Sequence, residues 1–268
     1  QTINFWWPLS FSFGHSKAGE YYNQGGFSFE GEDDLDSWFK RKSELLPGAV
    51  RDSLLIAYYW DADNPAAPVY SNGSGDDTGD PDRVTGFLHS AQIPGFTLLY
   101  ADKAADQKID DKAQPYSMPH GTIVLDFWGT RGLSLKQTYT GNDSRGRFPF
   151  DAITAGFDTK PQKGPMRFIT VGPYNLTKDK TINRFDSLTF VYGVGVGSIG
   201  WKEADSIGSS WMQKQISDSA KNAWVLKGTD SLWKVLDLSN WAWNRLSNGL
   251  SVPAPPPSPD ISVTSGPD

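Results

Sequence analysis

The sequence contains no cysteine in 268 residues, which excludes disulfide bonds, thiolate metal sites and a cysteine nucleophile. It also lacks any apolar run near the roughly 20 residues that a membrane-spanning helix needs. Basic residues are in deficit, because 25 Lys and Arg face 31 Asp and Glu and the formal net charge is -6. Nucleic-acid binding depends on clustered Lys and Arg. We therefore expect neither a transmembrane segment nor a nucleic-acid partner.

Aromatic and turn-forming residues, by contrast, are abundant. Aromatic residues make up 13% of the chain, and there are 27 Gly and 18 Pro. This composition is typical of short strands joined by many turns rather than of a helical bundle. The stretch before a proline-rich segment is long enough to bury a substantial core. We expect one mainly β domain over residues 1–250, a β-sandwich-like domain with C-terminal helices.

Runs of β-branched and aromatic residues mark the expected strands. In residues 187–197, apolar side chains alternate with Gly193, Gly195 and Gly197, which leave one face of the strand almost bare. A bare face indicates that another element packs closely on the strand, or that the strand bends. The other expected strands are 52–60, 96–100, 121–128 and 166–171.

The pattern changes to a helical period in the C-terminal part. Residues 205–224 and 229–246 repeat apolar residues near every 3.6 positions. Thr229 or Asp230 can cap the start of the second helix, and Gly249 can end it. The apolar stripe of this helix consists of Leu232, Val235, Leu236, Trp243 and Leu246.

Residues 251–259, with the sequence Ser-Val-Pro-Ala-Pro-Pro-Pro-Ser-Pro, predict a stiff linker. Such segments favour extended polyproline II and act as spacers. In residues 260–268, Ile261 and Val263 alternate with polar residues before a Gly-Pro turn, as in an opening β-strand. We expect these residues to begin the first strand of a following module.

Acidic side chains cluster where the expected strand 52–60 ends and in the glycine-rich loop that follows it. Calcium prefers six to eight hard oxygen ligands in flexible geometry, and glycine lets such a loop curl around an ion. The spacing departs from the EF-hand pattern, and a solvated acidic loop is the alternative interpretation. Calcium is the expected cofactor, and no organic cofactor is expected. The predicted metal ligands are Asp61, Asp63, Asp76, Asp77 and Asp80.

The 11 tryptophans suggest a carbohydrate ligand, since flat aromatic faces suit sugar rings. Trp60 and Trp128 end strongly apolar strands and are expected in the core. Trp6 and Trp7 precede Pro8 and cannot both face inward on a strand. Trp6, Trp7 and Trp201 are the candidate ligand-binding residues.

Known catalytic motifs are missing from the sequence. The three histidines, His15, His89 and His120, have neither the HExxH spacing of zinc proteases nor a Gly-x-Ser-x-Gly partner. Glycoside hydrolysis needs two carboxyl groups about 5 to 10 Å apart. Asp61, Asp126 and Glu203 are conceivable members, but the sequence does not pair them. The catalytic residues of any enzyme here are unknown.

A group of short motifs in the middle and last parts of the chain resembles a known family. The motifs are Arg-Phe-Ile-Thr-Val-Gly-Pro-Tyr-Asn-Leu at 167–176, Lys-Asp-Lys at 178–180, the glycine-rich strand at 188–197, a helix from Asp230 and the proline-rich exit. With Asp-Ser-Leu and its apolar run at 52–63, this order resembles a region of large secreted bacterial surface proteins. Those proteins carry fibronectin-type-III-like modules and a C-terminal sorting domain. The resemblance implies an extracellular, surface-attached region, makes residues 260–268 the start of a following fibronectin-type-III-like module, and carries over no catalytic residue.

These observations favour a non-catalytic extracellular module of a secreted, surface-displayed or filament-forming protein that binds calcium and glycan. Its expected partners are other modules or copies of the same protein, and polysaccharide. The alternative is a polysaccharide-acting enzyme, glycoside hydrolase-like, with an unidentified carboxylate pair. A cleft with convergent acids beside exposed Trp would favour the enzyme, and flat apolar patches would favour the module.

Overall fold

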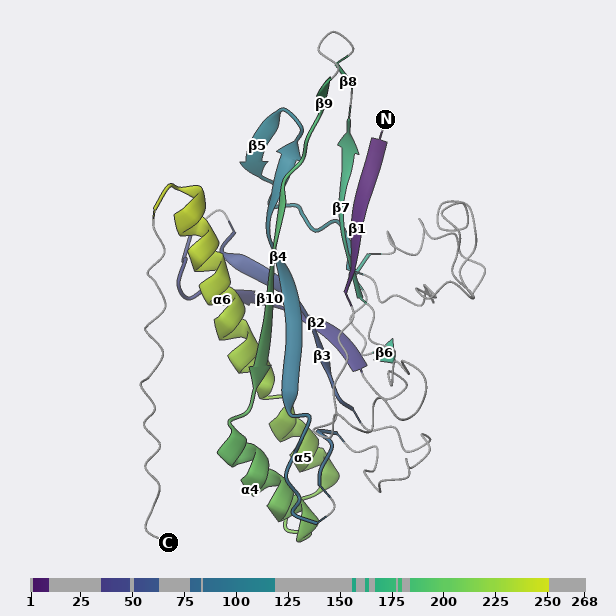
Figure 1. Ribbon diagram of the computed structural model, residues 1–268, viewed down its shortest axis with the longest axis vertical. Coiled ribbons are helices and arrows are strands. Elements are labelled where there is room, and N and C mark those ends of the chain that lie inside the picture. The colour runs from purple at the N-terminus through teal and green to yellow at the C-terminus, as the bar shows by residue number, and fades with distance from the viewer. Residues whose placement is uncertain are drawn as a thin grey trace, which may run out of the picture.

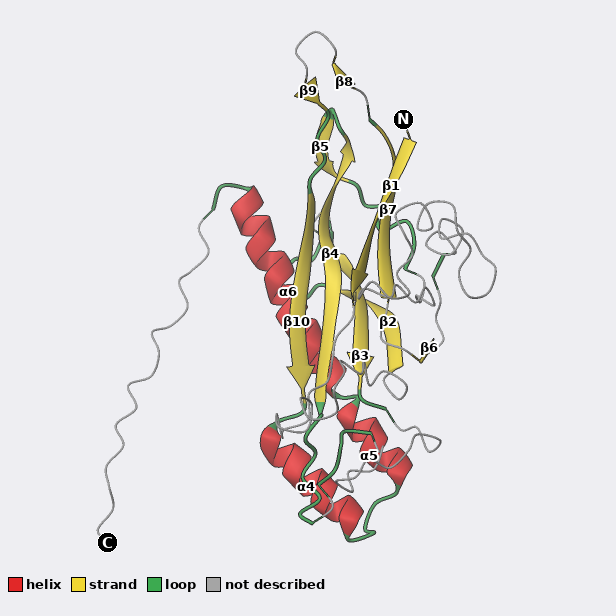
Figure 2. Cartoon of the chain, turned by 45° about the vertical axis from the view of Figure 1, so that its right-hand side comes forward, coloured by secondary structure: helices red, strands yellow, loops and turns green. Residues whose placement is uncertain are grey.

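The computed structural model describes residues 2–9, 35–48, 51–62, 78–82, 84–118, 156–157, 162–163, 167–176, 178–179 and 184–250. Strands predominate, and helices follow them at the C-terminal end (Figures 1 and 2), so the expectation of a mainly β fold with C-terminal helices is confirmed. The elements are β1 (Thr2–Leu9), β2 (Leu35–Lys42), β3 (Ser53–Trp60), β4 (Gln92–Ala104), β5 (Gln107–Asp110), β6 (Gln162–Lys163), β7 (Arg167–Asn175), β8 (Lys178–Asp179), β9 (Arg184–Phe185), β10 (Phe190–Ser198), α4 (Trp201–Met212), α5 (Asp218–Val225) and α6 (Gly228–Ser247).

The largest sheet is antiparallel and has six strands in the order β10-β4-β3-β2-β6, with β5 paired to the end of β4. Strands β2 and β3 pair along their whole length, from Leu35 opposite Trp60 to Lys42 opposite Ser53. Strands β1 and β7 form a separate two-stranded sheet, and β8 and β9 form a short hairpin. Figure 2 shows α6 alongside β10, and α4 and α5 at the end of the sheet where β10 finishes.

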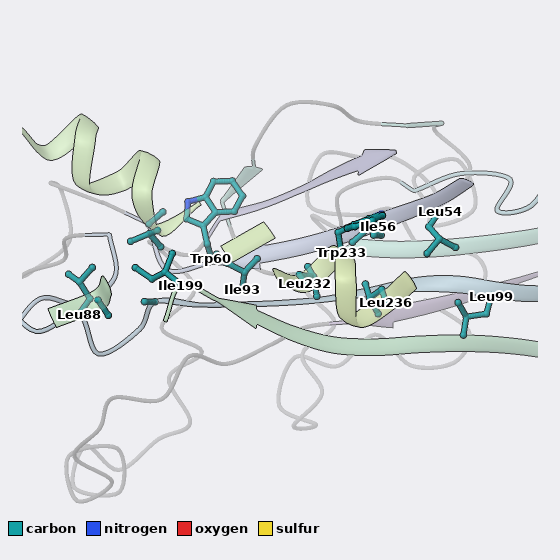
Figure 3. Close-up of a cluster of buried hydrophobic side chains, with 14 residues drawn as sticks. Leu54, Ile56, Trp60, Leu88, Ile93, Leu99, Ile199, Leu232, Trp233 and Leu236 are labelled. Atoms are coloured by element: carbon teal, nitrogen blue, oxygen red, sulfur yellow. The ribbon is translucent and has the colours of Figure 1, made fainter. Parts of the chain in front are cut away.

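The first hydrophobic core lies between this sheet and the helices. It joins Leu54 and Ile56 of β3 and Ile93 of β4 to Leu232 and Leu236 of α6. Figure 3 shows these side chains in a continuous row that runs from Leu88 to Leu99 and includes Trp60. Trp60 is 6% exposed, so its expected place in the core is confirmed.

Helix α6 packs on the face of β10 that carries Gly193, Gly195 and Gly197. This agrees with one of the two interpretations of the glycine pattern, a closely packed neighbour. A Cβ atom at Gly197 would overlap the backbone of Leu232 and Gly228, and one at Gly195 would lie 2.8 Å from Cγ1 of Val235. Glycine therefore lets the helix backbone approach the strand more closely than any other residue would allow.

The second hydrophobic core lies on the opposite face of the sheet. Ile169 and Val171 of β7 share it with Tyr59, Phe96 and Leu98 of the six-stranded sheet. Side chains of β3 and β4 on one face of the sheet pack in the first core, and those on the other face pack in the second core. Because both faces are buried, the sequences of these strands are apolar almost without interruption.

A buried ion pair crosses this second core. Arg167 of β7 and Asp36 of β2 both have fully buried side chains, and Arg167 Nη2 lies 2.5 Å from Asp36 Oδ1. Arg167 Nη1 also donates to the carbonyl oxygen of Met118 at 2.9 Å, and its backbone N–H donates to the Tyr59 hydroxyl oxygen at 3.0 Å. These bonds satisfy the guanidinium away from water, which a buried charge requires.

Several sequence-based boundaries were wrong. The helix expected over 205–224 is two helices, because residues 213–217 form a turn that contains Lys214 with a φ of 59°. Helix α6 begins at Gly228, before both expected caps. It ends as expected, with Gly249 at a φ of 70°. The expected strand at 121–128, which includes Trp128, and residues 251–268 lie outside the described residues.

Candidate functional site

The turn that precedes β4 is organised by the side chain of Asp82. Its Oδ1 accepts hydrogen bonds from the backbone N–H groups of Val84 at 2.8 Å and Thr85 at 2.7 Å, and from the Thr85 hydroxyl at 3.0 Å. The backbone closes the turn through the Asp82 N–H, which donates to the Phe87 carbonyl oxygen at 2.8 Å. An aspartate that accepts bonds from residues just ahead of it is a common way to fix a turn.

The same turn is held against α4. A Cβ atom at Gly86 would lie 2.5 Å from the carbonyl oxygen of Gly208, so both positions require glycine for this contact. The Ser209 hydroxyl donates to the Thr85 carbonyl oxygen at 3.2 Å, and Leu88 is buried beneath the turn. The turn is therefore a fixed platform, held against the C-terminal half of α4.

An aromatic row lies on this platform, and we define it as Trp201, Phe87 and His89. The Phe87 ring meets Trp201 at 5.4 Å between centroids and His89 at 5.2 Å, both edge to face. Asp82 ends the row, since its Oδ2 lies 3.6 Å from His89 Nε2. Trp201 is 72% exposed, so an indole face is open to solvent. Because Trp201 continues into Phe87 and His89, the exposed indole is part of a row of rings rather than an isolated apolar side chain, and such a row can contact a ligand or partner.

The carboxyl group of Asp82, at the end of the aromatic row, carries a negative charge over a wide pH range. Hydrogen bonds from the Thr85 and Val84 backbone N–H groups and from the Thr85 hydroxyl lower the pKa of Asp82 to about 2. The carboxylate is therefore ionised at neutral pH and acts only as a hydrogen-bond acceptor. Exposed rings beside a constant acceptor suit a ligand with both apolar faces and hydroxyl groups.

The other two candidate tryptophans lie elsewhere. Trp6 and Trp7 are in β1, where they pair with Thr170 and Ile169 of β7. Figures 1 and 2 place β1 far along the molecule from α4, so these residues are not brought to Trp201. The side chains of Trp6 and Trp7 are outside the described part of the structure.

Of the predicted calcium ligands, the structure describes two. Asp61 is buried just after β3. Asp80 has a φ of 49°, and its Oδ2 accepts a hydrogen bond from the Ser90 hydroxyl at 3.1 Å. Asp63, Asp76 and Asp77 lie outside the described residues. Within the described ranges, no group of three or more His, Cys, Asp and Glu could hold a metal ion, and the calcium site stays a prediction.

A polar pocket of about 380 Å³ lies at the opposite end of the sheet, next to the β4–β5 turn. Asp106 and Asp186 both line it, together with Lys103 and Asn175. Tyr174 also lines it but is 3% exposed, which leaves no ring face for a ligand to cover. Of the three carboxyl groups considered from the sequence, Asp61 is buried, Glu203 is exposed on α4, and Asp126 lies outside the described residues.

Comparison with protein-family models, with curated proteins and with solved structures gave no match. In the described helices, none combines the length and apolar character needed to cross a membrane.

Sequence reasoning named Trp201 as a candidate but did not include the residues that lie around it. Phe87 and His89 are separated by one residue, the spacing that puts two side chains on the same face of an extended segment. Asp82 followed by Thr85 and Gly86 is a turn signature. These local signals were present, but their meeting with Trp201, more than a hundred residues later, depends on the tertiary fold.

Proposed function

We propose that the chain is a non-catalytic extracellular module that binds polysaccharide through the aromatic row. The observation that carries the proposal is the exposed indole of Trp201, held edge to face by Phe87 on a fixed turn. A sugar ring presents C–H groups to an aromatic face, and its hydroxyls can donate to the Asp82 carboxylate. Calcium, bound by the predicted ligands near Asp61 and Asp80, would stabilise the loop that leads into this turn.

Binding is favoured over catalysis at this row by the protonation state of its carboxyl group. A glycosidase needs one carboxyl with a raised pKa to protonate the leaving group. The Asp82 pKa is lowered to about 2, so this group cannot supply a proton at neutral pH.

The proposal extends to architecture and location. We infer that the β1–β7 sheet and the six-stranded sheet are the two layers of a β-sandwich, because both contribute residues to the second core. Display outside the cell is supported by the resemblance to secreted surface proteins and by the proline-rich linker at 251–259.

The test is affinity electrophoresis of the full chain in gels that contain soluble polysaccharides of different backbones. For a polysaccharide that retards the chain, the Trp201→Ala variant should bind about tenfold more weakly, which corresponds to about 1.4 kcal/mol. Trp201→Phe should retain part of the affinity. The control is Val84→Ala, because Val84 is 90% exposed on the same turn and outside the row. Equal retardation of the Trp201→Ala variant and the original chain would reject the site.

The alternative function, a polysaccharide-acting enzyme, would use the pocket that contains Asp106 and Asp186. It predicts release of reducing sugar by the chain and loss of that release in Asp106→Asn and Asp186→Asn. We favour the binding module because the buried Tyr174 offers this pocket no stacking platform. Sustained sugar release that survives in Trp201→Ala and disappears in both Asn variants would establish the enzyme instead.

A further inference from the structure

Strand β10 is an edge of the six-stranded sheet. It is nine residues long, and its sequence, Phe-Val-Tyr-Gly-Val-Gly-Val-Gly-Ser, has neither a charge nor a proline. On the face away from α6, Val194 and Val196 are 56% and 54% exposed. A long, uncharged strand edge is a template for pairing with another strand.

Several other edges among the described strands carry features that normally prevent such pairing. Strand β1 contains Pro8 and an irregularity between Ile3 and Phe5. Strand β6 has only two residues. Strand β5 has four residues and includes Lys108 and Asp110. Among these edges, β10 is therefore the one suited to pairing.

Helix α6 carries an apolar stripe on the same side of the molecule. We define the α6 stripe as Val235, Leu238, Ser239, Ala242 and Leu246, which recur at the three- and four-residue spacing of one helix face. Val235, Leu238 and Leu246 are exposed, although the sequence pattern grouped Val235 and Leu246 with the buried Leu232 and Leu236. Ser239 and Ala242 are small, which allows another helix to approach closely.

The position of the stripe follows from the contacts of the helix. On one flank of α6, Asp237 accepts hydrogen bonds from the Ser43 hydroxyl and the Glu44 backbone N–H, and Asn240 donates to the Arg51 carbonyl oxygen. That flank faces the β2–β3 loop. Val235 packs over Gly195 of β10, so the stripe occupies the flank next to the free edge of β10.

We propose that a second copy of this chain covers this surface, with the two β10 strands paired antiparallel around a twofold axis. Such pairing would extend the sheet across both copies and put both α6 helices on the same face. Because α6 lies over β10 and β4, and neighbouring strands are about 4.8 Å apart, the two helices would run about 10 Å from each other. This is close to the 8–10 Å separation of packed helices, so the two α6 stripes would meet.

A twofold contact places each surface against itself, and a surface with like charges would then repel its own copy. Neither β10 nor the α6 stripe contains a charged residue, so this interface has no such conflict. Backbone groups along the β10 edge would pair with those of the second copy, and the exposed valines and leucines would leave water. This argues for a second copy rather than for a charged partner.

The inference does not depend on glycan binding, and its test is the oligomeric state of the full chain. Light scattering coupled to size exclusion at about 1 to 200 µM should show a dimer that dissociates on dilution. Val196→Lys and Leu238→Glu, both at exposed positions, should each weaken the dimer at least tenfold. The matched control is Ile109→Lys, since Ile109 is 58% exposed on β5, away from the proposed interface.

Hydrogen exchange identifies the surface directly. Amides of the peptide that covers β10 should be more protected at high concentration than at low concentration, and Val196→Lys should remove that difference. A chain that stays monomeric throughout the concentration range would overturn the proposal. So would a dimer that resists both substitutions, or one without added protection in β10.

Two further variants distinguish other outcomes. If the C-terminal segment of a second copy covered the edge, the double variant Ile261→Lys and Val263→Lys would abolish the dimer, which would overturn pairing of β10 with itself. The Trp201→Ala variant should dimerise normally, and Val196→Lys should retain polysaccharide binding. These two variants separate the proposals, so that failure of dimerisation can be told apart from failure of polysaccharide binding.

Discussion

Replacing Gly197 with alanine should push α6 away from the sheet, whereas the same change at Gly193 should be tolerated. At Gly197 the added methyl group would overlap backbone atoms of Leu232 and Gly228, which move only if the helix moves. At Gly193 its nearest neighbours are the side-chain methyl groups of Leu99 at 3.2 Å and Leu236 at 3.5 Å. Leucine side chains can adjust their rotamers, and a helix backbone cannot.

The expected free energies follow from two opposing effects. Alanine in place of glycine restricts the unfolded chain and so favours folding by about 0.4–1 kcal/mol. Overpacking a filled interface costs about 1–3 kcal/mol, and a clash with backbone belongs at the upper end of that range. Gly197→Ala should therefore lower the free energy of unfolding by about 2 kcal/mol. Gly193→Ala should stay within about 1 kcal/mol of the original protein, because burial of its methyl group offsets a small adjustment.

The assay is urea unfolding at 25 °C, followed by circular dichroism and by tryptophan fluorescence. The Gly197→Ala midpoint should fall at an unchanged slope, which indicates a loss of stability rather than a change in the unfolding transition. Both variants lie in the same strand and gain the same methyl group, so each controls for the other. The reasoning is refuted if Gly197→Ala is as stable as Gly193→Ala.

Three further outcomes are expected. Asp36→Ala should destabilise the protein by about 3–5 kcal/mol in the same assay, because it leaves the Arg167 guanidinium buried without its carboxylate; a loss below about 1 kcal/mol would show that the pair is unimportant. The hydrogen bonds to Asp82 lower its pKa from 3.8 to about 2, so their stabilisation is complete above about pH 4 and is lost as the pH falls through 2. The difference in stability between the original chain and Asp82→Ala should thus be constant from pH 7 to 5 and shrink toward pH 2, and a constant difference down to pH 2 would contradict it. Calcium at a hundred times its Kd should add about 2.7 kcal/mol to the free energy of unfolding, and excess chelator should remove that gain, more weakly in Asp80→Asn; identical melting curves with calcium and with chelator would eliminate the site.

The features that the sequence predicted correctly are those encoded by local periodicity. The alternation of Gly193, Gly195 and Gly197 with apolar residues indicated both a strand and a close packing partner, and α6 is that partner. The apolar run that ends in Trp60 indicated a strand, and this strand is β3, which lies between β2 and β4. In both cases the information lies within about ten consecutive residues, where side-chain alternation and burial determine the structure.

The features that the sequence did not predict depend on residues far apart in the chain. Asp36 and Arg167 are 131 positions apart, and no local pattern in the sequence links them. Helical periodicity likewise could not separate Leu232, which packs on the sheet, from Leu246, which faces solvent, because both fit the same repeat. Which flank of α6 is covered depends on where the sheet ends at β10.

The ion pair between Asp36 and Arg167 also bears on misfolding. If β7 slipped by one residue against its neighbour, every side chain of β7 would change faces, and Arg167 would leave the interior. Asp36 would then remain enclosed without the guanidinium that it needs. The same slip would expel Ile169 and Val171 from the second core. We therefore expect the buried ion pair to add to this apolar penalty, so that the wrong alignment costs more here than it would in a purely aliphatic core.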